Sequence, residues 1–147
     1  MHSEKKDMGI KLEYEVIKED FGRAGEASSD IKKVLRKLGI DSAIIRRVAI
    51  ATYEAEINIV IHSEGGKITV YIKPDKIEII AKDKGPGIKD INLAMQKGFS
   101  TASNKVRELG FGAGMGLPNM KKSSDEFDIE SKVGIGTTLK MIIYFNK

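Results

Sequence analysis

One segment of the chain constrains the fold more than any other. Residues 42–62, SAIIRRVAIATYEAEINIVIH, are apolar almost all the way round a helical wheel. Because a helix with this pattern has to be covered on most sides, we expect it to be largely buried. Asp41 or Ser42 can cap its first turn, and the helix is expected to end near His62. The few polar side chains of such a helix are therefore informative about function.

The rest of the chain consists of further helices and of strands that come in hairpins. Alternating apolar and polar residues predict a strand at 10–18, and Pro74-Asp75 joins two more strands as a hairpin. Partial segregation of helices and strands predicts an α+β fold, a two-layer α/β sandwich with helices on one face of a mixed, mostly antiparallel sheet. The expected strands are 10–18, 67–73, 76–82, 126–131 and 136–145, and the expected helices are 23–38, 42–62, 90–96 and 116–124.

Composition narrows the class of protein. A chain of 147 residues is expected to form one domain, which we place at 9–147 after a disordered tail at 1–8. There is no cysteine, so a disulfide scaffold and thiolate metal sites are excluded. A net charge of +4 without a concentrated basic face argues against a nucleic-acid partner. With no signal peptide and no apolar run that could span a bilayer, we expect a cytoplasmic protein without membrane contact.

A run of glycines precedes the last predicted helix. In GFGAGMGLPNMKK, residues 110–122, glycine stands at every second position up to Gly116, and Pro118 then suits a first helical turn. A helix N-terminus has free N–H groups and the positive end of the helix dipole, and glycine lets the backbone approach an anion closely. The spacing matches neither a Walker A loop nor a Rossmann fingerprint. A flexible loop is the ordinary explanation of such a run, but its position indicates a phosphate-binding site.

Two polar residues on the buried helix are candidates for chemistry. Glu54 and Asn58 are four residues apart and share one face. A carboxylate among apolar neighbours suits a general base, and an amide oxygen is a hard ligand suited to Mg²⁺. Glu54 could instead be a carboxylate at the rim of the core, and Glu56, on another face, is a rival base. For His62 we prefer an interaction with the dipole at the helix C-terminus.

A short loop, Asp83-Lys84-Gly85-Pro86-Gly87-Ile88, follows the apolar strand at 76–82. Many ordinary turns have this composition. An aspartate at a strand end can also accept a hydrogen bond from the amino group of adenine. Gly85 and Gly87 would then allow the backbone to lie against the base and the ribose.

Four motifs in this order resemble those of the GHKL, or Bergerat-fold, ATPases. They are Glu54-x-x-x-Asn58, Asp83-x-Gly85-x-Gly87, Gly112-x-Gly114-x-Gly116 and Gly134-x-Gly136-Thr137-Thr138. Within that superfamily the chain is most similar to the small bacterial serine/threonine kinases of partner-switching modules, which include anti-sigma-factor kinases and the stressosome switch kinase. The stretch GAGMGLPNMKKSSDEFDIESKVGIGTT carries much of this likeness. Ser123-Ser124 departs from it, because apolar residues are expected there.

The resemblance implies a kinase that transfers the γ-phosphate of ATP to a serine or threonine of a protein. By this likeness Asp83 binds adenine with help from Thr137 or Thr138, Asn58 holds Mg²⁺, and Glu54 is the catalytic base. Residues 97–109 fit a lid in which Lys97, Lys105 and Arg107 could face the γ-phosphate, although they could equally be solvated charges. The expected nucleotide-binding residues are Asn58, Asp83, Gly85, Gly87, Ile88, Gly112, Gly114, Met115, Gly116, Leu117, Thr137 and Thr138.

The resemblance also implies a protein partner. A STAS-type antagonist or scaffold protein is the expected substrate, and a sigma factor or a downstream phosphatase is a further candidate. Three alternatives stay open at this point. The chain could be an ATP-binding module that acts by sequestering a sigma factor or another regulator, a detached catalytic domain of a histidine kinase, or an α/β domain whose motifs are coincidental.

Overall fold

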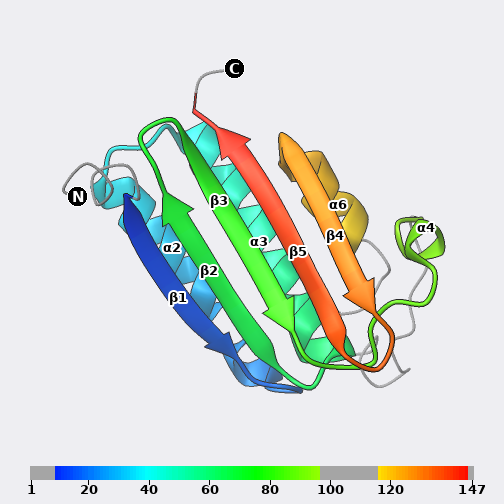
Figure 1. The fold of residues 1–147 in the computed structure, drawn as a ribbon. Helices are drawn as coiled ribbons and strands as arrows, with labels where there is room; N and C mark the ends of the chain where they lie inside the picture. Colours follow the sequence, from blue (N-terminus) through cyan, green and yellow to red (C-terminus); the bar gives the residue numbers. More distant parts are fainter. Residues whose placement is uncertain (1–8, 97–115, 146–147) are drawn as a thin grey trace, which may run out of the picture.

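The computed structural model describes residues 9–96 and 116–145, which form a sheet with helices packed on one face (Figure 1). This arrangement confirms the predicted two-layer α+β sandwich. The strands are β1 (Ile10–Val16), β2 (Gly66–Ile72), β3 (Lys76–Asp83), β4 (Glu126–Lys132) and β5 (Gly136–Tyr144). The helices are η1 (Phe21–Arg23, a 3₁₀ helix), α2 (Glu26–Lys37), α3 (Ser42–His62), α4 (Ile91–Ala94) and α6 (Gly116–Ser123).

The five strands lie in the order β1-β2-β3-β5-β4. The sequence predicts a mostly antiparallel sheet, and all four pairings between the described strands are antiparallel. Strands β1 and β4 therefore form the two edges. The central pairing of β3 with β5 sets Lys82 opposite Thr138, which brings the loop after β3 beside the turn before β5.

Helix α3 lies across the sheet and contacts α2 on one side and α6 on the other (Figure 1). Every second residue of the central strands faces these helices, as strand geometry requires. The predicted burial of α3 is confirmed, because most of its apolar residues lie in the core. The largest fully buried side chains are Ile31, Leu35, Val48, Ile59, Val60, Ile68, Ile77, Ile79, Met120, Leu139, Met141 and Ile143.

Several element boundaries have visible local causes. Asp41 caps α3 by accepting a hydrogen bond from the backbone N–H of Ala43 at 3.0 Å. Gly39, which follows α2, has a φ of 73°, as expected for a helix stop. The helix predicted from residue 23 begins instead at Glu26, because Gly25 has a φ of 99° and interrupts the helical backbone. No helix in the described parts of the chain is long and apolar enough to cross a membrane.

Candidate nucleotide site

Glu54 and Asn58 lie one turn apart on α3, and both are half-buried on the side of the helix that approaches α6. The side-chain amide of Asn119, on α6, donates a hydrogen bond to Oε2 of Glu54 at 2.9 Å. The other carboxylate oxygen, Oε1, lies 3.9 Å from where a Cβ on Gly116 would stand. The predicted base is therefore held at the first turn of α6.

Helix α6 begins at Gly116, the last glycine of the run. Leu117 is only 7% exposed and packs into the core, which anchors the helix start, and Pro118 stands in the first turn as predicted. An eight-residue helix leaves its first N–H groups without partners within the helix. The other predicted residues of this segment, Gly112, Gly114 and Met115, lie outside the described residues, as do Lys97, Lys105 and Arg107.

The structure separates the two rival carboxylates of α3. Glu56 faces α2, is 4% exposed, and accepts a hydrogen bond from the backbone N–H of Ala27 at 3.3 Å. Burial raises the pKa of Glu56, although nearby backbone N–H groups act against this shift. Glu54, on the α6 side, is the carboxylate that lies beside the end of the glycine run.

Asp83 ends β3 and lies against the start of β5. Its carboxylate accepts a hydrogen bond from the backbone N–H of Thr137 at 3.1 Å. Burial raises the pKa of Asp83, and the Thr137 bond partly offsets that shift. The Thr137 hydroxyl lies 2.8 Å from Oγ of Ser131, which also accepts a hydrogen bond from the backbone N–H of Ile88 at 2.7 Å. This network fixes Asp83, Thr137 and Ile88 relative to one another.

The loop after β3 packs directly on the turn between β4 and β5. Gly87 has a φ of 73°, and a Cβ there would stand 2.4 Å from the carbonyl oxygen of Lys132. Gly136 has a φ of 153°, and a Cβ there would stand 2.1 Å from the carbonyl oxygen of Asp83. These close approaches require glycine. Gly85 lies against Ser63, just after α3, so the end of α3 meets the same loop.

Alternation along β5 distinguishes the two threonines. Thr137 is buried on the helix-facing side, together with Leu139 and Met141, and contacts Asp83. Thr138 points to the opposite face of the sheet and pairs across with Lys82. The geometry thus brings Thr137, and not the side chain of Thr138, to Asp83.

His62 is the last residue of α3, and burial lowers its pKa.

Sequence reasoning missed two residues of this site. Asn119 is a polar residue on the helix after the glycine run, but its partner Glu54 is 65 positions away. Ser131 lies on an edge strand and is ordinary in sequence, although it bridges Ile88 to Thr137. Neither contact has a local sequence signal, because each depends on how distant elements pack.

The donor set near Asn58 restricts which metal the site could hold. In the described parts of the chain, no group of three or more histidine, aspartate or glutamate residues could form a metal cage. The Asn58 side-chain amide has no hydrogen-bond partner among these residues, so its oxygen is available. Magnesium commonly keeps several waters and takes few protein ligands together with substrate phosphates. An amide oxygen on α3, one turn after Glu54, fits that mode of binding.

Comparison with known proteins gives consistent matches. Residues 17–143 match the family model of the histidine kinase-like ATPase domain. The serine/threonine-protein kinase RsbT of Bacillus subtilis (strain 168) is 35% identical over 115 residues, which cover 76% of this chain and 80% of RsbT. An anti-sigma F factor of Caldanaerobacter subterraneus subsp. tengcongensis is 35% identical over 108 residues, covering 70% of this chain and 72% of that protein.

A solved structure shows the same fold. The crystal structure of the SiaB-SiaC complex from Pseudomonas aeruginosa aligns with a TM-score of 0.63 at 12% identity, covering 97% of this chain and 95% of the matched chain. The chain belongs to the histidine kinase-like ATPase domain family, as the motifs in the sequence predict. Membership in an ATPase domain family implies that the chain binds ATP.

Proposed function

We propose that the chain is an ATP-dependent serine/threonine protein kinase of a bacterial partner-switching module, which transfers the γ-phosphate of ATP to a STAS-type protein. The observation that carries this proposal is the position of Glu54, which Asn119 holds beside the first residue of α6. A base located where phosphate is expected to bind can accept the proton of an incoming hydroxyl. The similarity to RsbT supports the same reaction.

Each part of the site has a role in this proposal. Asp83 accepts a hydrogen bond from the adenine amino group, supported by Thr137 and by the loop that contains Gly85, Gly87 and Ile88. Gly112, Gly114, Met115, Gly116 and Leu117 form the phosphate-binding segment. Asn58 would hold Mg²⁺, which supplies charge neutralisation at the phosphates. Because phosphoryl transfer depends mainly on positioning and electrostatic stabilisation, one base, one metal and one phosphate-binding segment suffice.

Around this reaction we propose a single ATPase domain at 9–147, preceded by a tail at 1–8, in a cytoplasmic protein. A STAS-type antagonist or scaffold would be the substrate, and a sigma factor or a phosphatase could bind in addition. A second candidate function is sequestration of a regulator with ATP as a structural ligand. It is favoured by the relatives that are named anti-sigma F factors.

The first experiment is calorimetric titration with ATP and ADP, each with and without Mg²⁺. We expect binding that Mg²⁺ strengthens, and Asn58→Ala should remove this strengthening while leaving metal-free binding unchanged. An unchanged affinity of Asn58→Ala in the presence of Mg²⁺ would exclude Asn58 from the metal site. Absence of nucleotide binding by the unmodified chain at millimolar concentration would overturn the kinase proposal.

The second experiment distinguishes the kinase from the sequestering module. Glu54→Ala should lower phosphoryl transfer to a STAS-type substrate at least 100-fold, since general-base catalysis contributes about 10²–10⁴, while ADP affinity stays within about twofold. Glu56→Ala serves as the matched control on the other side of α3. Normal transfer by Glu54→Ala would remove the assigned base. Partner binding without any transfer by the unmodified chain would favour sequestration.

A further inference from the structure

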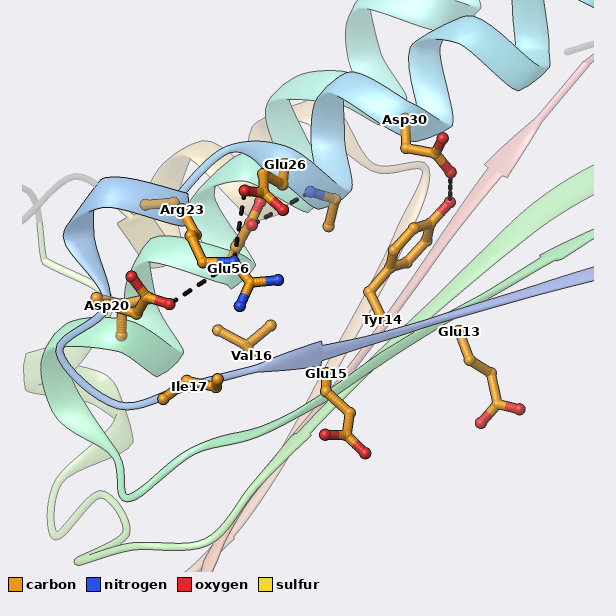
Figure 2. A pocket seen from close by; sticks show the side chains of 13 residues that line it. Glu13, Tyr14, Glu15, Val16, Ile17, Asp20, Arg23, Glu26, Asp30 and Glu56 are labelled. Carbon is orange, nitrogen blue, oxygen red and sulfur yellow. Dashed lines mark hydrogen bonds and ion pairs between the residues drawn. The ribbon is translucent and has the colours of Figure 1, made fainter.

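A hollow lies on the other side of α3 from the candidate nucleotide site. It has a volume of about 440 Å³ and lies between β1 and the start of α2 (Figure 2). The last four residues of β1, Glu13–Val16, and Ile17 after them line one wall. Residues of η1 and α2 line the opposite wall, and Glu56 and Val60 of α3 complete it. We call this hollow the β1 groove.

The groove follows the free edge of the sheet. Strand β1 is the first strand in the order, and among the described strands it pairs with β2 alone. An edge strand leaves every second pair of backbone N–H and C=O groups without strand partners. The groove runs beside Glu13–Val16 of β1, so this unpaired edge of the strand borders it. An extended segment could therefore add to the sheet here by β-augmentation.

The helix side of the β1 groove carries four carboxylates and one arginine, in a chain whose net charge is +4. Arg23 lies 3.9 Å from a carboxylate oxygen of Asp20 and 3.5 Å from one of Glu26, so it offsets only part of this charge (Figure 2). At the far end, the Tyr14 hydroxyl donates a hydrogen bond to Asp30 at 2.5 Å. Strand alternation turns the side chains of Glu13 and Glu15 to the other face of the sheet (Figure 2), so the carboxylates on the helix side of the groove are those of Asp20, Glu26, Asp30 and Glu56.

Glu56 shows where a ligand would be most favoured. Its side chain is 4% exposed, Oε2 accepts a hydrogen bond from the backbone N–H of Ala27, and the N–H groups of Gly25 and Ser28 also favour its charged form. The other oxygen, Oε1, is buried and has no hydrogen-bond partner in the described parts of the chain. A buried acceptor without a donor is unfavourable, so a donor supplied from the groove would stabilise it. A lysine or arginine side chain supplies such a donor together with a compensating charge.

We propose that the β1 groove binds an extended, basic segment of a partner protein, which adds to the free edge of β1 and places one lysine or arginine side chain against Glu56. The charge of the groove selects a basic segment over an acidic one. The length of exposed strand edge selects an extended segment over a helix. This surface is separate from Glu54 and α6. A test of peptide binding at the groove is therefore independent of whether the chain transfers phosphate.

Fluorescence anisotropy with a labelled seven-residue peptide, Thr-Arg-Val-Arg-Val-Arg-Thr, tests this proposal. We expect saturable binding to the unmodified chain. Binding should be lost for a peptide with glutamate in place of arginine, and for one with proline in the centre, which cannot pair as a strand. Glu56→Gln, which keeps the shape and removes the charge, should weaken binding about tenfold. The matched control is Glu130→Gln on β4, the opposite edge, which should leave affinity unchanged.

Amide hydrogen exchange of the complex should show slowed exchange within residues 13–17 and not on β4. Equal weakening by Glu56→Gln and Glu130→Gln, or equal binding of the proline peptide, would overturn the proposal, because non-specific attraction to surface charge would then explain binding. Protection confined to other elements would overturn it as well. Should Glu56→Gln not fold, the exposed Asp30→Asn on the helix side of the groove replaces it, with weakening of about threefold expected and unchanged affinity contradicting the proposal.

Discussion

Among single residues, Asn119 has the most specific position relative to Glu54. Its amide donates to one carboxylate oxygen and leaves the other directed towards Gly116. Asn119→Leu keeps a side chain of similar size but removes this donor. Because proton acceptance requires the base to be oriented, we expect kcat to fall about tenfold, a fraction of the full general-base contribution. ADP affinity should stay within twofold, since Asn119 has no proposed contact with the nucleotide.

A control on the same helix distinguishes orientation from helix stability. The Ser124 hydroxyl donates to the carbonyl of Met120 at the other end of α6. Ser124→Ala removes a hydrogen bond there without approaching Glu54 and should leave kcat unchanged. If both variants lower kcat equally, or if Asn119→Leu weakens ADP binding as much as it lowers kcat, Asn119 acts through the structure of α6.

At the scale of elements, the turn between β4 and β5 holds the proposed adenine-binding residues in place, and it contains a matched pair of glycines. Gly134 and Gly136 both have positive φ, at 82° and 153°. A Cβ on Gly134 would meet nothing within 4 Å, whereas one on Gly136 would meet the Asp83 carbonyl oxygen at 2.1 Å. Gly134→Ala should therefore cost only about 1 kcal/mol of unfolding free energy, the backbone strain alone.

Gly136→Ala should cost about 3 kcal/mol, because the strands have to separate in addition to the strain. Since that separation displaces Asp83, ADP affinity should also fall at least tenfold, and Gly134→Ala should retain it. Urea unfolding and calorimetry measure the two effects. Retained ADP affinity in Gly136→Ala would mean that β5 moves without disturbing Asp83, and an equal loss of unfolding free energy in both variants would mean that the approach to the Asp83 carbonyl oxygen adds no cost.

The helices and strands also show which parts of the fold local sequence patterns can predict. Alternation and helical spacing predicted every described strand and helix, apart from the short η1, because local burial patterns determine them. The start of α2 was misplaced because the left-handed backbone of Gly25 interrupts the helical pattern. The choice between Thr137 and Thr138 stayed open in the sequence, and the pleat of β5 distinguishes them once its register with β3 is known.

For the whole molecule, the central position of α3 explains both what the sequence predicted and what it did not. Burial of the helix made its polar residues conspicuous, so Glu54, Asn58 and Glu56 were all identified. The wheel could not show that one side of α3 faces α6 and the other faces α2. Packing of distant elements therefore separates a candidate base from a buried carboxylate beside the β1 groove.

The pH dependence of the unfolding free energy should show the effect of the buried carboxylate of Glu56. Burial raises the pKa of Glu56 above its ordinary value of 4.5. Below this value Glu56 is protonated in the folded and unfolded states, so its ionisation has no effect on stability. As pH rises through 4.5 and then through the raised pKa, the unfolded chain loses the proton more readily. Glu56 therefore lowers the unfolding free energy by about 1.4 kcal/mol for each unit of its shift.

Other carboxyl groups change stability in the opposite direction, for example Glu13, whose pKa is lowered by its hydrogen bond with Lys67. The unmodified chain alone would therefore not isolate Glu56, and Glu56→Gln, which cannot ionise, is the reference. We expect the unfolding free energy of the unmodified chain, minus that of Glu56→Gln, to fall as pH rises above 4.5 and then to level off. Urea unfolding at a series of pH values measures this difference. A difference that stays constant, or that grows with pH, would show that Glu56 is not ionised at a cost in the folded protein, and that its Oε1 already has a compensating partner.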